Sequence, residues 1–340
     1  MKIRSTLLYF AGICLLACGC NKDKNGKTAP DPSYTSRIPF VLQDNFTFDV
    51  LWAALNYADM QDSLLQEGPY TLLAAHNDAF ALFNQTSNDP ARFTYFITYN
   101  KARQLMQYSI LSGILSTKAM PLQENKAYLT HLGTNVYISK YLQNGDTIVT
   151  MNGIRLKSLD NPASNGLIQV LSELPNVENF PSLVTAVRSD TSLSLFSAAM
   201  KHSGLTDSLD GAKDAYTLLP PINRACMSSG TVLASMERIS QSTPEELKTL
   251  LRYHIIKGRY FTSDLFRAVA ADPSGITMQD GGKVGIGGSP TGFNSIRFTG
   301  TGNDGMAAGI PPFPYQRFDL NSNIPAGNGV MHKIDRVLIP

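Results

Sequence analysis

The sequence has almost no cysteine outside its first twenty residues. Cys14, Cys18 and Cys20 lie in that opening segment, and Cys226 is the one cysteine in the rest of the chain. A single thiol can form neither an intrachain disulfide framework nor a cysteine-based zinc site. The body of the chain therefore depends on core packing for its stability.

Charged side chains are scarce too. They make up 16% of the residues, whereas hydrophobic residues make up 43%. That balance excludes a disordered chain and supplies enough apolar material for packed cores. Removing Lys2 and Arg4, at the extreme N-terminus, from the 29 basic residues leaves 27, equal to the 27 acidic residues. A neutral body has no electrostatic attraction for phosphate backbones, so we expect no nucleic-acid partner.

Catalytic and metal-binding motifs are also missing. The sequence contains no G-x-S-x-G, no S-x-x-K with its companion motifs, and neither H-x-x-H nor H-E-x-x-H. Serine hydrolases and zinc enzymes need such arrangements of nucleophile, base or ligands. We therefore expect a protein that is not an enzyme and holds no cofactor.

The N-terminus carries an export pattern. Two cations come first, an apolar run extends from Leu7 to Leu16, and small residues follow. This is the order of regions in a secretory signal, and the run is too short to span a bilayer. The small residues end at cysteines and resemble the lipobox of bacterial lipoproteins, whose cysteine becomes the acylated N-terminus. We expect a lipoprotein signal peptide over residues 1–19; an ordinary cleaved signal or an uncleaved anchor is the alternative.

Two cysteines compete for the lipid. We favour Cys20, because the polar NKDK that follows it resembles the start of surface lipoproteins of the Bacteroidota type. Cys18 is the rival, since Leu15 stands at the favoured third position before it. Several acyl chains on one cysteine would anchor the protein stably. Residues 20–35 suit a flexible tether, so the expected address is the bacterial cell envelope, with the lipid in the outer membrane and the body at the cell surface or on the periplasmic face.

The rest of the chain repeats itself once. Four segments recur in the same order, at offsets of 145, 146, 145 and 163 residues. The pairs are 49–64 with 194–209, 70–80 with 216–226, 105–113 with 250–258, and 165–174 with 328–337. The last offset places about 18 extra residues in the second copy, after Gly258. The repeat agrees with the two domains that a length of 340 residues suggests.

The residue pattern of each copy predicts the same order of helices and strands. An amphipathic helix comes first, with apolar residues at helical spacing: Val50, Leu51, Ala54 and Leu55, then Leu195, Phe196, Ala199 and Met200. A short strand follows at 70–73 or 216–219, then further helical segments. Copy one closes with strands at 135–142 and 147–159, the second interrupted by an Asn152-Gly153 hairpin signal. Helices followed by strands predict α+β domains.

Two segments of copy two resemble a known family. NGVMHKIDRVLIP (328–340) and LLRYHIIKGRY (250–260) are close to the closing block and the central Tyr-His block of the fasciclin domain. Copy one keeps the first block of that family over 71–74 and 77–80, with Ala75 in place of the usual proline and Ser109 in place of the histidine. From about residue 36 to the end, the chain is similar to a tandem fasciclin-domain lipoprotein of the Bacteroidota type.

The resemblance implies a fold and a role. Each copy is expected to be an α+β domain, a β-sandwich or wedge decorated with helices, with domain 1 over 36–178 and domain 2 over 179–340. An insertion near 277–325 in domain 2 is the expected place for specificity. The family implies a non-catalytic role in cell adhesion or in binding an extracellular protein or glycan. The alternative is a glycan-binding accessory of an outer-membrane polysaccharide uptake system.

The Tyr-His block raises a choice between chemistry and structure. The family ties this block to adhesion, so Tyr253, His254 and Tyr108 are candidate binding-associated residues. A general base needs an orienting partner, and a metal needs further ligands. The positions three and four residues from His254 hold no carboxylate or histidine. We therefore predict a buried imidazole that packs between Tyr253 and Ile255 and hydrogen-bonds to the backbone.

Three short motifs are interpreted as loops or turns. GTGNDG (300–305) fits a dinucleotide-binding glycine pattern, but prolines soon after it prevent the helix that such a site requires. DLNSN (319–323) is followed by Ile324 and Val330 where an EF-hand has Gly and Glu. Asp62-Ser63-Leu64 and its counterparts at 207–209 and 146–148 resemble bacterial O-glycosylation sites, with plain polar turns as the alternative.

Overall fold

A computed structural model of the chain describes residues 34–80, 90–211, 213–289, 295–312 and 321–340. The signal peptide predicted over 1–19, nearly all of the predicted tether, and the rival cysteines Cys18 and Cys20 lie outside these residues, as do parts of the predicted insertion. Across the described ranges, no helix has the length and apolar character needed to span a membrane.

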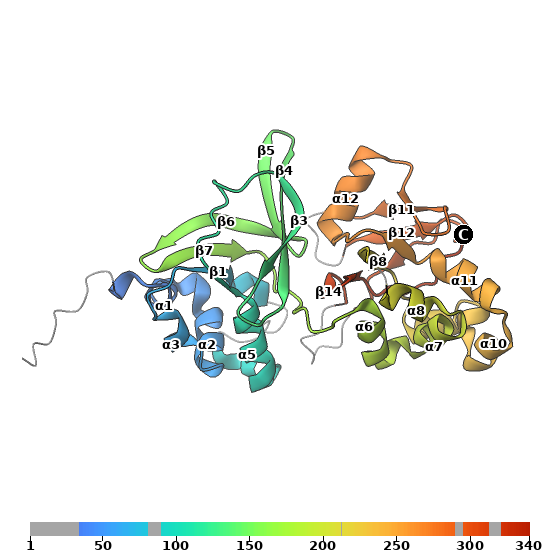
Figure 1. Cartoon of the computed structure of the whole chain (residues 1–340), viewed down its shortest axis with the longest axis horizontal. Coiled ribbons are helices and arrows are strands. Elements are labelled where there is room, and N and C mark those ends of the chain that lie inside the picture. Colours follow the sequence, from blue (N-terminus) through green and yellow to red (C-terminus); the bar gives the residue numbers. More distant parts are fainter. Residues whose placement is uncertain (1–33, 81–89, 212, 290–294, 313–320) are drawn as a thin grey trace, which may run out of the picture.

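Two α+β domains follow one another along the chain (Figure 1). In each domain helices come first in sequence and strands close the unit, and most helices form a layer against one side of the strands. The predicted fold class, a tandem pair of α+β domains, is confirmed.

Domain 1 bends one large sheet over its helices. The helices are α1 (Ile38–Gln43), α2 (Asp49–Tyr57), α3 (Gln61–Leu64) and α5 (Tyr99–Tyr108). The strands are β1 (Tyr70–Ala75), β2 (Ile110–Ser112), β3 (Gln123–Leu129), β4 (Asn135–Gln143), β5 (Asp146–Met151), β6 (Ile154–Ala163) and β7 (Gly166–Leu171). Their order is β2-β1-β7-β6-β5-β4-β3, with only β1 and β7 parallel. Register shifts along β6 mark the bend, and Figure 1 shows β3, β4 and β5 rising away from β1 and β7.

Domain 2 divides its strands between two sheets. Its helices are α6 (Leu183–Ser189), α7 (Ser194–His202), α8 (Leu205–Asp210), α9 (Asn223–Met227), α10 (Met236–Gln241), α11 (Pro244–Arg252) and α12 (Thr262–Ala271). One sheet has the order β14-β15-β8-β9, from β14 (Ile324–Ala326), β15 (Gly329–Met331), β8 (Tyr216–Leu218) and β9 (Ile255–Lys257). The other has the order β10-β11-β12-β13, from β10 (Ile276–Thr277), β11 (Lys283–Gly287), β12 (Arg297–Gly300) and β13 (Ala308–Gly309).

The sequence predicted the central helix of each domain correctly. Helix α2 buries Val50, Leu51, Ala54 and Leu55, and α7 buries Leu195, Phe196, Ala199 and Met200. The predicted hairpin is also present: Asn152 and Gly153 connect β5 to β6 with φ angles of 49° and 78°. Two positive φ angles at the centre of a two-residue turn match the right-handed twist of the strands.

Equivalent asparagines fasten the helices to the strands in both domains. The side-chain oxygen of Asn165 accepts from the backbone N–H of Ile38 at 2.9 Å, and its nitrogen donates to the Leu64 carbonyl at 2.7 Å. Asn328 makes the same two bonds in domain 2, with the first residue of α6 and with the carbonyl of Leu209, each at 2.8 Å. The internal repeat is thus a repeat of polar contacts as well as of apolar pattern.

Helix α12 breaks the symmetry. It follows β9 directly, where domain 1 has only a short turn at 117–119 between β2 and β3. Some of the extra residues of copy two therefore precede the 277–325 region in which the sequence located the insertion. The two copies have no aligned segment between Gly258 and Asn328. The repeat therefore predicts the number of extra residues in copy two but not their positions.

Candidate functional site at the domain interface

His254 is a structural residue. Its side chain is completely buried; Nδ1 donates to the Leu250 carbonyl at 2.9 Å, and Nε2 accepts from the backbone N–H of Leu338 at 3.0 Å. The edge of the imidazole meets Phe196, with ring centroids 6.0 Å apart. Burial lowers the pKa of His254 to about 4, so the ring is neutral at neutral pH. The predicted buried imidazole, hydrogen-bonded to the backbone, is confirmed.

The two tyrosines of the Tyr-His block are buried as well. The Tyr253 hydroxyl donates to the Lys283 carbonyl at 2.6 Å and accepts from the backbone N–H of Thr301 at 3.0 Å. The Tyr108 hydroxyl donates to the Asn135 carbonyl at 2.8 Å and accepts from the Asn152 side chain at 2.8 Å. Each tyrosine therefore joins a helix end to a strand of its own domain. The predicted link of Tyr253, His254 and Tyr108 to binding stays a prediction, and these side chains have no exposed surface with which to meet a ligand.

The domains meet around Tyr137 of β4. The Arg259 guanidinium lies over its ring, 3.8 Å from the centroid, and Phe261 packs at 6.0 Å. The Tyr137 hydroxyl donates to Glu178, in the segment between the domains, at 2.7 Å. Arg259 also donates to the Ala326 carbonyl at 2.8 Å, which ties it to the β14–β15 hairpin. A buried aromatic ring that is stacked on one domain and hydrogen-bonded to the connecting segment holds the pair in one arrangement.

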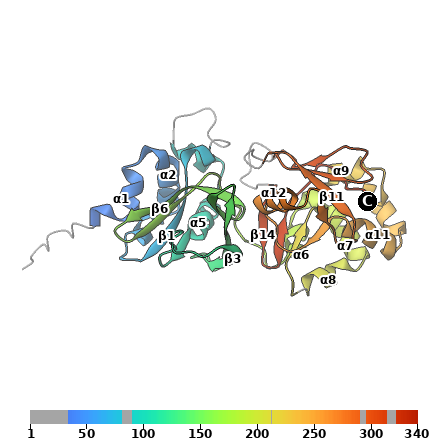
Figure 2. The same cartoon turned by 90° about the horizontal axis from the view of Figure 1, so that it is seen from above.

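A second set of contacts joins β3 to α12. The Asn125 side chain donates to Asp264 at 2.8 Å and to the Arg259 carbonyl at 2.9 Å. Arg267 bridges Glu124 at 2.9 Å and Asp264 at 3.4 Å. Figure 2 shows α12 and β14 along the side of domain 2 that faces domain 1. Helix α12, which has no counterpart among the described residues of domain 1, is therefore part of the interface.

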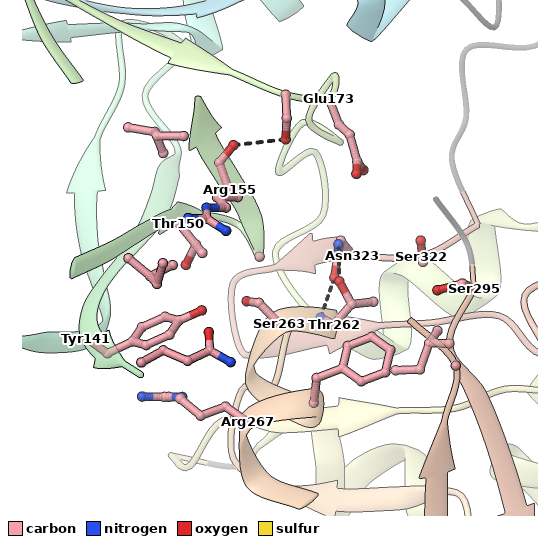
Figure 3. A pocket seen from close by; sticks show the side chains of 18 of the residues that line it. Tyr141, Thr150, Arg155, Glu173, Thr262, Ser263, Arg267, Ser295, Ser322 and Asn323 are labelled. Atoms are coloured by element: carbon pink, nitrogen blue, oxygen red, sulfur yellow. Dashed lines mark hydrogen bonds between the residues drawn. The ribbon is translucent and has the colours of Figure 1, made fainter. Parts of the chain in front are cut away.

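A cleft of about 1210 Å³ opens beside these contacts (Figure 3). One wall comes from β4, β5, β6 and the residues after β7; the other comes from α12, the ends of β11 and β12, and the residues before β14. Side chains that can donate or accept hydrogen bonds line both walls, among them Thr150, Arg155, Glu173, Thr262, Ser263, Ser295 and Asn323. The aromatic rings of Tyr141 and Phe266 lie on opposite walls.

Several polar groups in the cleft lack partners within the described ranges, among them Arg155, Glu173 and Ser263. The Arg155 guanidinium is exposed, points into the cleft, and makes no hydrogen bond or ion pair there. Glu173 likewise has no partner, and burial raises the pKa of its carboxyl. The Ser263 hydroxyl oxygen is buried without a hydrogen bond. Buried polar atoms without a partner are uncommon in folded proteins, so the Ser263 hydroxyl, in a cleft that also holds the Arg155 guanidinium and the Glu173 carboxyl, makes the cleft a candidate ligand site.

The lining does not form a recognisable catalytic or metal centre. Across the described residues, no three histidine, cysteine or carboxylate side chains lie together as metal ligands would. The five histidines of the chain do not line the cleft, and neither does Cys226. What the arrangement offers is recognition: fixed hydrogen-bonding groups, two aromatic rings and charged groups of both signs.

Sequence reasoning missed this site. The strands that carry Thr150 and Arg155 were predicted from their alternation and hairpin turn, but no motif marks their side chains as ligand-binding. The opposite wall depends on α12, which follows Gly258 in a stretch where the repeat supplies no alignment. A signal was available in retrospect: TSDLFRAVAA (262–271) has helical apolar spacing and lies in the extra length of copy two.

Comparison with known sequences gives a match to the family described as "Fasciclin domain" over residues 46–174 and 191–340. Transforming growth factor-beta-induced protein ig-h3 of Oryctolagus cuniculus is 24% identical over 305 residues, covering 85% of this chain and 40% of that protein. Stabilin-2 of Mus musculus is 22% identical over 295 residues, covering 85% of this chain and 10% of that protein. The chain thus spans less than half the length of these relatives.

A bacterial relative matches a smaller part of the chain. Protein sll1483 of a Synechocystis strain is 29% identical over 150 residues, covering 44% of this chain and 76% of that protein. Among solved structures, a FAS1 domain pair from the insect cell adhesion molecule fasciclin I covers 86% of this chain and 96% of its own length. The sequence identity is 17% and the TM-score 0.39.

Proposed function

The chain belongs to the fasciclin-domain family, and from that membership we propose that it is a non-catalytic adhesion or extracellular binding protein. The observation that supports this most directly is the tandem pair itself. Two family domains are fixed against each other through Tyr137 and Arg259 and share a cleft with unpaired polar groups. A rigid pair of this kind presents one composite surface to a partner.

The proposed site of action is the bacterial cell envelope. The N-terminal sequence supports a lipid on Cys20, with Cys18 as the rival, and residues 20–35 as the tether to the folded pair. A multiply acylated cysteine gives lasting attachment to a membrane surface. In cells labelled with a palmitate analogue, we expect label on the wild-type chain and on Cys18→Ala, but not on Cys20→Ala. Label that persists in Cys20→Ala would overturn the choice of cysteine.

The adhesion proposal is tested with cells. A strain that lacks this chain is expected to attach less to surfaces coated with extracellular protein or polysaccharide, and the wild-type chain is expected to restore attachment. Equal attachment with and without the chain, on every coating, would overturn the proposal.

A glycan-binding accessory of a polysaccharide uptake system is the second candidate. The specific observation in its favour is the cleft, whose volume of about 1210 Å³ and polar lining suit a sugar chain. Slower growth of the deletion strain on polysaccharide, with unchanged growth on the corresponding monosaccharide, is the expected sign of that role.

A further inference from the structure

The size and the lining of the interdomain cleft limit what it can hold. Sites for drug-sized ligands occupy roughly 300–1,000 Å³, and this cleft, at about 1210 Å³, has room for several sugar rings. The hydroxyls of Thr150, Thr262 and Ser263 and the Asn323 amide match the many hydroxyls of a saccharide, and Phe266 offers an apolar face for a ring.

The walls offer little to a peptide that binds by strand addition. That mode needs an unpaired strand edge. In the domain 1 wall, β5 and β6 pair with each other only through Thr150–Arg155 and Met151–Ile154, so the start of β5 keeps one short free edge. The facing wall is mainly helix α12, whose backbone groups bond along the helix. A peptide strand could pair with that one edge, whereas side chains of both walls can serve a glycan, so a peptide comparison ligand separates the two.

One charged group of the cleft suits an acidic ligand. Three cationic side chains line the cleft, Arg155, Lys157 and Arg267, together with three acidic ones, Asp78, Asp146 and Glu173. Lys157 pairs with Asp78 at 3.1 Å, and Arg267 is held by Glu124 and Asp264. Arg155 alone is left without an ion pair in the described part of the chain, and its guanidinium faces the centre of the cleft in Figure 3. A planar guanidinium in this position suits a carboxylate, to which it can form two parallel hydrogen bonds.

We propose that the interdomain cleft binds an acidic oligosaccharide, with a sugar carboxylate on Arg155 and sugar hydroxyls on Glu173, Ser263 and the neighbouring polar groups. The site is assembled from both domains, because Arg155 lies on β6 of domain 1 and Ser263 on α12 of domain 2. This inference rests on the proposed role in extracellular binding and names the class of partner.

The direct test is calorimetric titration of the full chain in detergent with hexamers of galacturonate and of mannuronate. The fully methyl-esterified galacturonate hexamer and a glutamate hexapeptide serve as comparison ligands. We expect at least one acidic hexamer to bind, with at least tenfold weaker binding of the ester and of the peptide. No binding of either acidic hexamer, or tighter binding of the peptide, would overturn the proposal.

Two charge-matched variants locate the site. Arg155→Gln is expected to weaken binding of the acidic hexamer at least tenfold. Arg188→Gln removes the same charge from an exposed position on α6, outside the cleft lining, and is expected to leave the affinity unchanged. Equal affinities of the two variants would overturn the assignment of Arg155.

The same variants separate this inference from the adhesion proposal. If Arg155→Gln restores cell attachment as well as the wild-type chain but does not bind the hexamer, the cleft is not the adhesive site, while adhesion stands. If neither chain restores attachment, the adhesion proposal fails, and the titration still decides whether the cleft binds sugar.

Discussion

Domains 1 and 2 place different polar side chains at the end of the helix that precedes β2 or β9. In domain 2, His254 links the carbonyl at the end of α11 to the backbone N–H of Leu338. In domain 1 the equivalent residue is Ser109, whose hydroxyl donates to the Leu105 carbonyl at 2.8 Å and reaches no further. The residue equivalent to Leu338 is Pro175, which has no N–H to donate. The donor and its acceptor have thus been lost together, so neither domain leaves this pair of groups half-satisfied.

A second pair of residues repeats the comparison. His332 Nε2 donates to the Tyr260 carbonyl at 2.9 Å, and its Nδ1 accepts from the backbone N–H of Asn323 at 3.2 Å. Gln169 makes the equivalent bonds in domain 1. Its side chain donates to the Leu115 carbonyl at 2.9 Å and accepts from the backbone N–H of Asp160 at 2.9 Å. An amide and an imidazole can thus make the same two hydrogen bonds at this position, but only an imidazole has an ordinary pKa near neutral pH.

The largest expected effect comes from removing the His254 side chain. His254→Ala strands two buried backbone groups and leaves a cavity, so we expect a loss of about 4 kcal/mol in the free energy of unfolding. Ser109→Ala removes one of two donors to the Leu105 carbonyl, which keeps its bond from the Ser109 backbone N–H at 3.0 Å, and should cost about 1 kcal/mol or less. Denaturant unfolding can separate the domains: Trp52, the one tryptophan of the chain, lies on α2 and reports domain 1 by fluorescence, whereas circular dichroism reports both domains. Equal losses in the two variants would contradict the comparison.

Acid is expected to destabilise domain 2 more than domain 1, in which burial also lowers the pKa of His131. Burial lowers the pKa of both His254 and His332 from 6.5 to about 4, so between these values the unfolded domain binds protons that the folded domain does not. The stabilisation is complete above pH 6.5 and is lost as the pH falls through 4. At pH 5.5 the two histidines together should cost about 3 kcal/mol.

The measurement compares circular dichroism with Trp52 fluorescence during unfolding at pH 7.5 and 5.5. His332→Gln introduces the domain 1 residue and should remove about half of the pH dependence. A parallel loss in both signals, unaltered by the substitution, would show that the carboxylates common to both domains control acid stability instead.

The interface itself can be broken at Tyr137. Tyr137→Ala removes the ring between Arg259 and Phe261 and leaves Glu178 without its hydroxyl partner, so coupling between the domains should fall by about 2 kcal/mol. We expect the fluorescence and circular dichroism transitions to move apart. Leu129→Ala, at an exposed position on β3, is the control and should leave them together. Coincident transitions in Tyr137→Ala would mean that the domains are coupled elsewhere.

The smallest expected effect is the coupling between His254 and Leu338. His254→Ser reproduces the domain 1 residue but leaves the Leu338 N–H unpaired, and Leu338→Pro removes that N–H. In a double-mutant cycle, we expect His254→Ser to cost about 1 kcal/mol less in the proline background than alone. Additive effects would show that the paired replacement in domain 1 has no energetic basis in this hydrogen bond.

The sequence predicted what depends on local pattern and on the repeat. The buried faces of α2 and α7, the Asn152-Gly153 turn and the buried state of His254 each follow from spacing, turn chemistry or the composition of neighbouring residues. The cleft could not be predicted in this way. Its two walls lie more than eighty residues apart in sequence, from Leu174 to Thr262, and they meet because Tyr137, Arg259 and Asn125 fix the relative position of the domains. No periodicity encodes that contact.

The position of Gly153 shows how closely the domains approach. A side chain there would place its Cβ 2.5 Å from the Cβ of Phe261, and the φ angle of 78° already favours glycine. Glycine at this position is therefore required both by the hairpin turn and by the contact between the domains. The Asn-Gly pair, which the sequence marks only as a local turn, also lies in the domain interface.

Helix α12 also gives the contact between the domains a direction. The contact is head-to-tail: the β3–β5 face of one domain meets the α12 side of the next. Heterologous contacts of this kind extend without limit when every unit carries both surfaces. Domain 1 has the receiving face but no α12 of its own in the described residues. Within the described residues, domain 1 therefore has no α12 surface to offer to the β3–β5 face of another domain, so the contact cannot repeat on the domain 1 side.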